Sequence, residues 1–463
     1  MKVLILFILI FKCSSPLTEG NKREDRNPKF AFVNEIGLNS VRVNWTCPAK
    51  DLGFILYGIG NYNLRASSNF VSEFQTIRLT GLNSSSTYQY QVFCGQIQIN
   101  QRSLLIYQNA ILKFTTLTPP PSDAQIRTRG IWLLGGIGSD ARPISAIDLF
   151  DPIENRFYAN IASIPTPRAY AQIISHKNKI YVIGGLTRST SGVYLQSSVV
   201  EEFDVFLNTW QTKANMPSTL QGGVIGSVGE EIVLLAGTTT VDMTTGTVLN
   251  TVYKFRPDVG TLGTWATPLI SASTIFARID MAHCTIAGNI FFTGGRLFSD
   301  GSLLATTDAY ITSSNSTSFI NEASISSPAR MGAAAACYRP NNSDPNPSDQ
   351  AGILVIGGSS LQNVSQPPSA ITSSDRYEFM QVGTSTNAFT TGPSLPVSVY
   401  YPGIEISYEQ RKAFVFGGAT EINLPTDTIY SINLTNPVAG PWTLETIKMP
   451  RARFGHKAII INR

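Results

Sequence analysis

The sequence predicts an all-β protein in which a small β-sandwich precedes a six-bladed β-propeller. Two patterns indicate this fold class. An apolar segment ending in two small residues recurs six times after residue 129, and residues 28–117 alternate between apolar and polar side chains. The composition agrees, because only 14% of residues are charged and the 37 glycines and 26 prolines are typical of short strands separated by turns. The formal net charge of +4 is small for this length and gives nucleic-acid binding no support.

The N-terminus carries the pattern of an export signal. A basic start, Met1-Lys2, precedes an apolar run over residues 3–11 that is too short to cross a membrane as a stable helix. We therefore predict an export signal over residues 1–15 and a polar tether over residues 16–27.

Two kinds of export signal fit this segment. In a bacterial lipoprotein signal, Cys13 would become the lipidated N-terminus, although Lys12 stands where a small residue is normal. In an ordinary cleaved signal, Cys13 would be lost. We favour the first, which places the protein at the cell surface or outer membrane through a lipid anchor, and the second predicts secretion.

Residues 28–117 are predicted to form the sandwich. Val41, Val43 and Trp45 share one face of a strand, and Leu82 precedes Thr87-Tyr88 by a short turn. These residues resemble the fibronectin-type-III family, in which a Leu fills the core and a Tyr hydroxyl satisfies backbone groups at a corner.

The same resemblance implies a disulfide. Cys47 and Cys94 end the segments that correspond to strands B and F of that family, which lie in opposite sheets and run the same way. A bond between them would stabilise the domain by about 3–4 kcal/mol in the chain-entropy model. Two free thiols are the alternative.

A linker over residues 118–128 follows. Its three consecutive prolines, Pro119-Pro120-Pro121, favour an extended and semi-rigid spacer. We place the domain boundary there, so the propeller occupies residues 129–463.

Two marks define the repeat in this second part. The first is the small doublet, at Gly135-Gly136, Gly184-Gly185, Ala236-Gly237, Gly294-Gly295, Gly357-Gly358 and Gly417-Gly418. The second is a pair of anchors after each doublet: Phe150/Phe157, Phe203/Trp210, Phe255/Trp265, Tyr310/Phe319, Phe379/Phe389 and Ile432/Trp442. Together they resemble the kelch repeat, in which aromatic side chains fill the wedge between blades. Ala236 departs from the pattern, and we expect it to be tolerated through a negative φ.

The ring is predicted to close with the end of the chain. The first unit begins at its second strand, near Gly130, and residues 453–461 form an innermost strand with no blade after it. This strand should complete the first blade and remove a free sheet edge.

Arginines mark four of the loops that lead into innermost strands. They are Arg168, Arg278, Arg330 and Arg453, and the other two loops carry Leu220-Gln221 and Tyr400-Tyr401. The kelch resemblance implies that these loops surround the mouth of the central channel, where related adaptors capture acidic peptides. We therefore expect the four arginines and Tyr400 to bind a ligand with an acidic group such as a carboxylate or sulfate. The alternative is that the arginines pack between blades and pair locally.

Metal and redox chemistry find little support. There is no Cys-x-x-Cys pair, so no metal and no cofactor are expected. His283 and His456 fall on innermost strands, and galactose oxidase chemistry would further need a paired Tyr and Cys. Cys284 and Cys337 lie six and seven residues after Arg278 and Arg330, so we expect their side chains to point to opposite faces and to remain unbridged.

We interpret the protein as a non-enzymatic surface or secreted binding protein, monomeric, with an extracellular protein or glycan as partner. The membrane would be contacted only through a lipid on Cys13. The alternative is a carbohydrate-active enzyme resembling the N-acetylneuraminate epimerases, which are six-bladed kelch rings. Charged side chains gathered at the axis would favour that alternative.

Overall fold

The computed structural model describes residues 28–461 except 49, 96–106, 109–110, 190, 240–250, 268, 271–277, 287, 298–300, 314–315, 322–324, 326–328, 339–351, 361–376, 382–387, 421–423 and 436–439. Cys13 and the predicted export signal therefore lie outside the described residues. The chain divides into two compact units, and the division runs through the strands before residue 118. Within the described residues, no helix is both long and apolar enough to span a membrane.

The strands before residue 118 form two sheets. One contains β1 (Lys29–Asn34), β2 (Ser40–Thr46) and β5 (Phe74–Thr80). The other contains β4 (Leu64–Val71), β3 (Leu52–Gly58), β6 (Thr87–Cys94), β7 (Tyr107–Gln108) and β8 (Leu112–Thr115). Trp45, Leu82 and Tyr88 are buried, and a disulfide joins Cys47 after β2 to Cys94 at the end of β6.

The rest of the chain begins with the short helix α1 (Ala124–Arg129), which Asp123 caps by accepting a hydrogen bond from the backbone N–H of Gln125. Six sheets follow among the described residues, and we number them sheets 1–6 in chain order.

Each sheet has four main strands, named from the innermost outward. Sheet 1 is β37 (Phe454–Ile459), β9 (Ile131–Ile137), β10 (Ala146–Asp151) and β11 (Arg156–Ser163), and sheet 2 is β12 (Gln172–His176), β13 (Lys179–Ile183), β16 (Val200–Asp204) and β17 (Thr209–Thr212). Sheet 3 is β18 (Val224–Val228), β19 (Glu231–Leu235), β20 (Thr251–Arg256) and β21 (Thr264–Trp265), with β22 (Leu269–Ile270) also on β20, and sheet 4 is β24 (Ala282–Ile286), β25 (Asn289–Thr293), β27 (Thr307–Ser313) and β28 (Ser316–Asn321). Sheet 5 is β29 (Ala334–Tyr338), β30 (Gly352–Ile356), β31 (Tyr377–Gln381) and β32 (Phe389–Thr391), and sheet 6 is β33 (Gly403–Ser407), β34 (Lys412–Phe416), β35 (Ile429–Asn433) and β36 (Thr443–Leu444). Two small ribbons, β14 (Leu186–Arg188) with β15 (Tyr194–Gln196) and β23 (Arg278–Ile279) with β26 (Arg296–Leu297), lie beside them.

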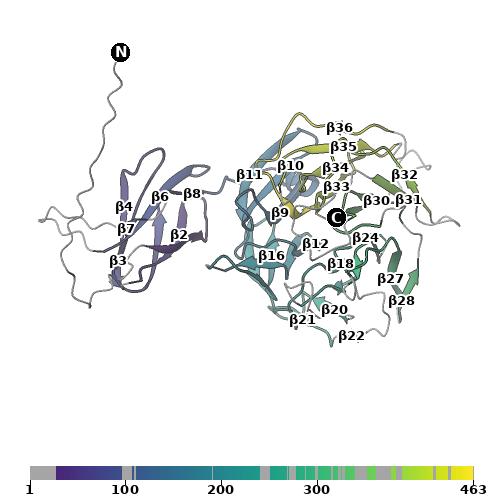
Figure 1. Ribbon diagram of the computed structural model, residues 1–463, viewed down its shortest axis with the longest axis horizontal. Coiled ribbons are helices and arrows are strands. Elements are labelled where there is room, and N and C mark those ends of the chain that lie inside the picture. The colour runs from purple at the N-terminus through teal and green to yellow at the C-terminus, as the bar shows by residue number, and fades with distance from the viewer. Residues whose placement is uncertain are drawn as a thin grey trace, which may run out of the picture. The chain divides into compact units, whose positions relative to one another are not determined.

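These sheets surround a common axis, with β12, β18, β24 and β33 near the centre of the ring (Figure 1). The hydrophobic core is divided among the interfaces between neighbouring sheets. Separate clusters of buried residues join sheets 1 and 2, 2 and 3, 3 and 4, 4 and 5, 5 and 6, and 6 and 1. Because each sheet is apolar on both faces, it is stable only between two neighbours, and closure of the ring buries the last exposed face.

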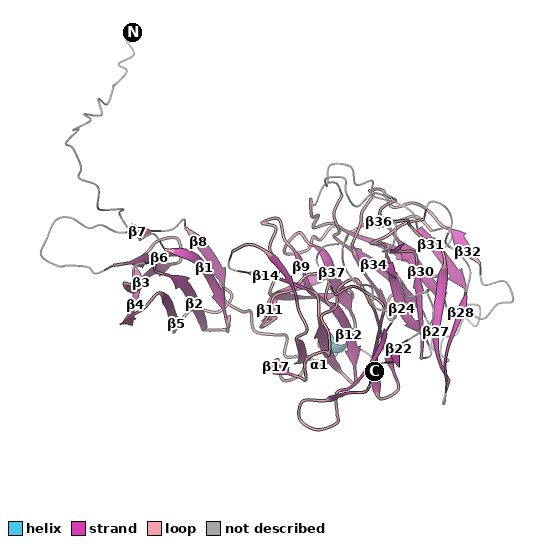
Figure 2. Ribbon diagram, turned by 60° about the horizontal axis from the view of Figure 1, so that its bottom comes forward, coloured by secondary structure: helices cyan, strands magenta, loops and turns pink. Residues whose placement is uncertain are grey.

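The end of the chain supplies the innermost strand of sheet 1. β37 lies beside β9 (Figure 2) and pairs with it in antiparallel orientation. In this register Phe454 lies opposite Ile137 and Ile459 lies opposite Trp132. Sheet 1 thereby acquires the same four-strand order as the other sheets.

The anchors seen in the sequence are cross-strand partners in several sheets. Phe150 pairs with Phe157, Phe203 with Trp210 and Phe255 with Trp265, with ring centroids 4.8–5.0 Å apart. In sheet 5 the partner of Phe389 is Met380 and not Phe379. The register there is shifted by one residue from the expected one.

Ala236 does not follow its prediction. Its φ is +56°, in the left-handed region, where the glycines of the other doublets also lie. The backbone at this strand end is imposed by the fold, and Ala accepts it at a cost of about 1 kcal/mol relative to Gly.

The prediction for Cys284 and Cys337 was wrong, because the two residues form a disulfide between β24 and β29 with a Cα–Cα distance of 5.5 Å. Their side chains do occupy opposite faces of their own sheets. Around a ring, however, the front face of one sheet packs on the back face of the next, so side chains on opposite faces of neighbouring sheets meet.

Candidate axial binding site

The four arginines predicted to face a ligand are buried. Arg168, Arg278, Arg330 and Arg453 are 0–1% exposed, and Tyr400 is 3% exposed. Tyr400 packs in a cluster with Ile137, Ala169, Ala419 and Phe454. The expectation of an arginine ring open to a ligand is therefore corrected in favour of local pairing.

Arg168 shows what these arginines do. Its guanidinium donates to the carboxylate of Glu201 at 2.5 Å and to the carbonyls of Val199 and Val182 at 2.6 and 3.1 Å. Glu201 belongs to β16 of the same sheet, so the ion pair ties the entry of the innermost strand to the third strand.

The same pair recurs in two other sheets. Arg278 donates to Asp308 on β27, and Arg453 donates to Asp148 on β10. Burial lowers the pKa of Arg453 to about 10, which is still high enough to keep the guanidinium charged at neutral pH. We call these buried arginine–carboxylate pairs struts, because each joins the loop before an innermost strand to the third strand of the same sheet. A buried charge of this kind must be satisfied by its own partners and is not open to a ligand.

The positions occupied by these arginines, and the matching positions of the other two loops, are called strut positions here. Two residues after each strut position, the six loops meet around the axis. We call this set the axial girdle: Tyr170, Gly222, Asp280, Gly332, Tyr401 and Gly455. Large side chains and glycines alternate around the ring, because Tyr170, Asp280 and Tyr401 enter from sheets 2, 4 and 6 while the glycines enter from sheets 3, 5 and 1.

Backbone hydrogen bonds link the girdle from loop to loop. The N–H of Asp280 donates to Gly222, Gly332 to Asp280, Tyr401 to Gly332, Gly455 to Tyr401 and Tyr170 to Gly455, all at 2.7–3.0 Å. This chain of bonds fixes the distances between the loops, so the side chains are held on a rigid frame.

The alternation has a steric cause. A Cβ atom on Gly222, Gly332 or Gly455 would come within 2.8–2.9 Å of Asp280, Tyr401 and Tyr170, respectively. Each large side chain therefore lies over the neighbouring glycine, and six large side chains would not fit.

All six girdle residues have positive φ, including the three that are not glycine. Tyr170, Asp280 and Tyr401 have φ of +52°, +59° and +49°. Such a backbone costs about 1–3 kcal/mol for a residue other than glycine, and strain of this kind concentrates at functional sites. The observation makes these three side chains the first candidates for binding.

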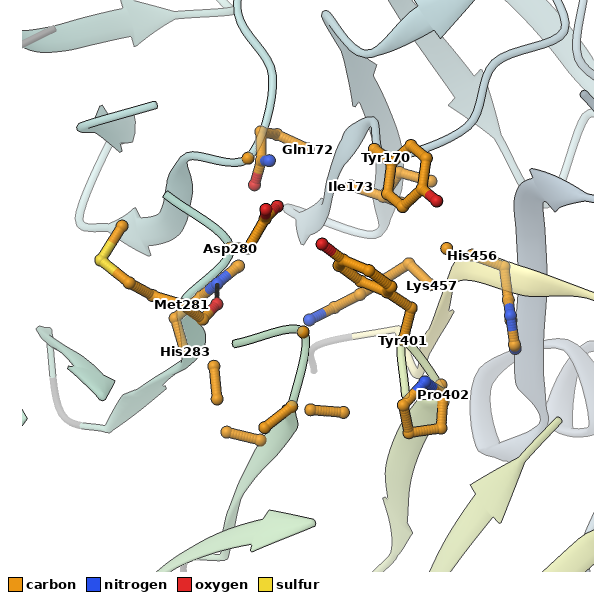
Figure 3. Close-up of a pocket in the computed structure, with 18 of the residues that line it drawn as sticks. Tyr170, Gln172, Ile173, Asp280, Met281, His283, Tyr401, Pro402, His456 and Lys457 are labelled. Atoms are coloured by element: carbon orange, nitrogen blue, oxygen red, sulfur yellow. Dashed lines mark hydrogen bonds between the residues drawn. The ribbon is translucent and has the colours of Figure 1, made fainter. Parts of the chain in front are cut away.

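The girdle opens into a cavity of about 110 Å³ on the axis. Figure 3 shows Gln172, Asp280, Tyr401 and Lys457 directed towards this space, with the Tyr401 hydroxyl facing the Asp280 carboxyl. The rings of Tyr170 and Tyr401 are 5.0 Å apart and nearly perpendicular.

The carboxyl of Asp280 is the polar centre of the girdle. Burial raises its pKa, while the hydroxyl of Tyr401 and the charge of Arg296 act in the opposite direction. Burial also raises the pKa of Tyr401, with Asp280 acting in the same direction, so the phenol stays protonated and can donate a hydrogen bond.

A second cavity of about 140 Å³ lies further along the axis and shares His283 and Lys457 with the first. It is also lined by Glu405 and by the disulfide of Cys284 and Cys337. Burial lowers the pKa of His283 to about 3, with the charge of Lys457 contributing, and raises the pKa of Glu405 to about 7. His283 is therefore neutral at pH 7.

His456 is buried close to the axis, and burial and the charge of Arg453 hold its pKa well below the usual range. Within the described ranges no three His, Cys, Asp or Glu side chains come together to hold a metal ion.

The axial residues were missed at the sequence level, although the signal was present. The segment Arg453-Phe454-Gly455 has its counterpart in Arg330-Met331-Gly332, and Arg168-Ala169-Tyr170 and Arg278-Ile279-Asp280 replace the glycine. A departure from glycine at this place in the repeat marks a girdle side chain.

Comparisons with known proteins agree with the fold. The kelch motif matches residues 167–217. Two relatives are the F-box/kelch-repeat protein At1g22040 of Arabidopsis thaliana, 33% identical over 19% of this chain, and beta-scruin of Limulus polyphemus, 30% identical over 24% of it. The chain matches only 18% and 14% of the length of these two relatives. The solved structure of YjhT superposes with a TM-score of 0.51 at 14% identity, covering 71% of this chain and 99% of YjhT. The protein is therefore all-β and contains a kelch β-propeller, as predicted.

Proposed function

We propose that this protein is an exported, non-enzymatic binding protein whose six-bladed propeller binds a glycan through the axial girdle. The proposal keeps the fibronectin-type-III-like sandwich as the element that carries the propeller, and an export signal in residues 1–15 with Cys13 as the lipidated residue. The partner is extracellular, and the protein acts as a monomer.

One observation carries the proposal: the three large girdle residues have positive φ at positions where backbone hydrogen bonds join the loops around the axis. Two tyrosines, a carboxyl group and the Gln172 amide line one cavity. Aromatic rings pack against the C–H faces of sugars, while carboxyl and amide groups bond to their hydroxyls.

The test is a glycan-array screen of the full chain, followed by titration of the strongest ligand. Asp280→Asn is the variant of choice because Asn tolerates positive φ and keeps the side-chain volume. Tyr401→Phe removes a hydroxyl and retains the ring over Gly332. Each should weaken binding about tenfold, since one hydrogen bond contributes about 1.5 kcal/mol.

The matched control is Tyr158→Phe, which removes the hydroxyl of a tyrosine on the outer strand β11. It should bind like the unmodified protein. If Asp280→Asn and Tyr401→Phe both bind glycans with unchanged affinity, the girdle is not the site.

The alternative, a carbohydrate-active enzyme, is supported by the charged side chains at the axis. Asp280, Glu405 and Lys457 line connected cavities. Proton NMR of the bound sugar separates the two functions, because an epimerase converts N-acetylneuraminate or a related sugar between anomers or epimers and a binding protein does not.

A further inference from the structure

The two cavities on the axis together form what we call the axial channel. The amine of Lys457 lines this channel and has no carboxylate partner among the described residues. It lies on β37, is half-buried and lines both cavities. Elsewhere in the propeller Lys179 and Lys213 pair with Glu202. The Lys457 amine has no ion pair or hydrogen bond within the part of the chain that the structure describes.

The walls around this amine are mostly apolar. Ile173 of β12, Ala335 of β29 and Ile404 of β33 line both cavities with it. Among the titratable groups on the walls, His283 of β24, which is neutral at pH 7, lines both cavities with Lys457, and Glu405 of β33 lines the second cavity.

The carboxyl of Glu405 is occupied by other donors. It accepts backbone N–H groups of Ile406 at 2.9 Å and of Ile460 at 3.1 Å. Burial lowers the pKa of Lys457, and Glu405 only partly opposes this effect. An amine in such surroundings is a nucleophile, because the neutral form is the one that reacts.

We propose that Lys457 is a reactive amine that captures small aldehydes entering the axial channel as imines. The lone pair of Nζ adds to the carbonyl carbon, and the carbonyl electron pair moves onto oxygen. The two N–H hydrogens then leave with that oxygen as water, and a C=N bond remains. The step needs no oxidant or reductant, and it uses the same channel as glycan binding without depending on it.

The test is reductive trapping of the full chain. The protein is incubated at pH 7 with glycolaldehyde and sodium cyanoborohydride, and the modified lysines are followed over time by peptide mass spectrometry. Lys50 and Lys113, both exposed, are internal references. Lys457 should react severalfold faster than either, since burial lowers its pKa and so increases the fraction of neutral amine at pH 7.

Three controls test whether the reactivity of Lys457 comes from the folded channel. In urea-unfolded protein the advantage of Lys457 should vanish, and at pH 10 it should shrink because the exposed lysines also lose their protons. Lys457→Met should remove one equivalent of rapid labelling while the near-ultraviolet circular dichroism stays unchanged. Labelling of native Lys457 no faster than Lys50, or an advantage that persists in urea, would overturn the proposal. Loss of glycan binding in Asp280→Asn with Lys457 labelling intact would leave both conclusions standing.

Discussion

The pair formed by Arg168 and Glu201 makes the struts of the propeller testable by a double-mutant cycle. Both side chains are nearly inaccessible, at 0% and 3% exposed. Glu201→Tyr leaves the arginine charge facing only backbone carbonyls, and Arg168→Leu leaves the carboxylate with the hydroxyl of Thr166, 2.8 Å away. Removing one partner of a buried ion pair costs about 3–5 kcal/mol.

The double variant has a natural template in the same chain. Sheet 3 carries Leu220 at the strut position and Tyr253 at the register position of Glu201. Arg168→Leu combined with Glu201→Tyr copies that arrangement, so it should lose much less stability than the two single changes added together. We expect a coupling of at least about 2 kcal/mol.

Urea unfolding followed by tryptophan fluorescence and near-ultraviolet circular dichroism measures these differences. The surface pair of Lys448 and Asp427 is the control, because Lys448→Ala should change the free energy of unfolding by less than about 1 kcal/mol. The reasoning fails if either single change at the buried pair costs less than about 1 kcal/mol, or if the double variant loses the full sum.

Two further predictions concern the axis. Cys284→Ala should lower the free energy of unfolding by about 4 kcal/mol in oxidising buffer, as expected for a disulfide across a separation of 53 residues. Cys337→Ala should have the same effect, and in reducing buffer both losses should be much smaller. Equal stability of all forms in oxidising buffer would show that the bond is absent. Glu405 has a folded pKa of about 7, which is above its value in the unfolded chain. Protonation of Glu405 therefore stabilises the fold by about 3 kcal/mol below about pH 4.5, and this contribution is lost as the pH rises through 7. Glu405→Gln should remove this part of the pH dependence in parallel urea titrations between pH 4.5 and 8, and an unchanged slope would contradict the assignment.

The repeat could be predicted from the sequence because its marks are local. A glycine doublet at a strand end and an aromatic pair across a turn act within a single sheet, so Phe203 and Trp210 could be paired without knowing the ring. The failures came where two sheets meet. Cys284 and Cys337 were judged by the faces of their own sheets, whereas the disulfide depends on how neighbouring sheets stack.

The partners of the buried arginines also leave a mark in the sequence. In each sheet, one residue of the third strand pairs with the position two residues before the doublet. In the four sheets whose loop carries an arginine, this residue is Asp148, Glu201, Asp308 or Glu378. In the other two sheets it is Tyr253 or Tyr430. A charge that appears in the strand only when the loop carries an arginine indicates an internal pair. A ligand-binding arginine would need no such partner.

The same comparison explains why the axis was invisible from sequence. The strut residue and the girdle residue are two positions apart in one loop, but the first points into its own sheet and the second is bonded to the loops of neighbouring sheets. No single repeat contains the contact between Tyr401 and Gly332 or between Tyr170 and Gly455, since each contact joins residues of two different sheets that pack around the axis. Packing around the axis allows three large side chains, and the chain keeps two tyrosines and an aspartate there in a strained backbone. Glycine would relieve that strain at all three positions, so we expect these side chains to contribute to the channel.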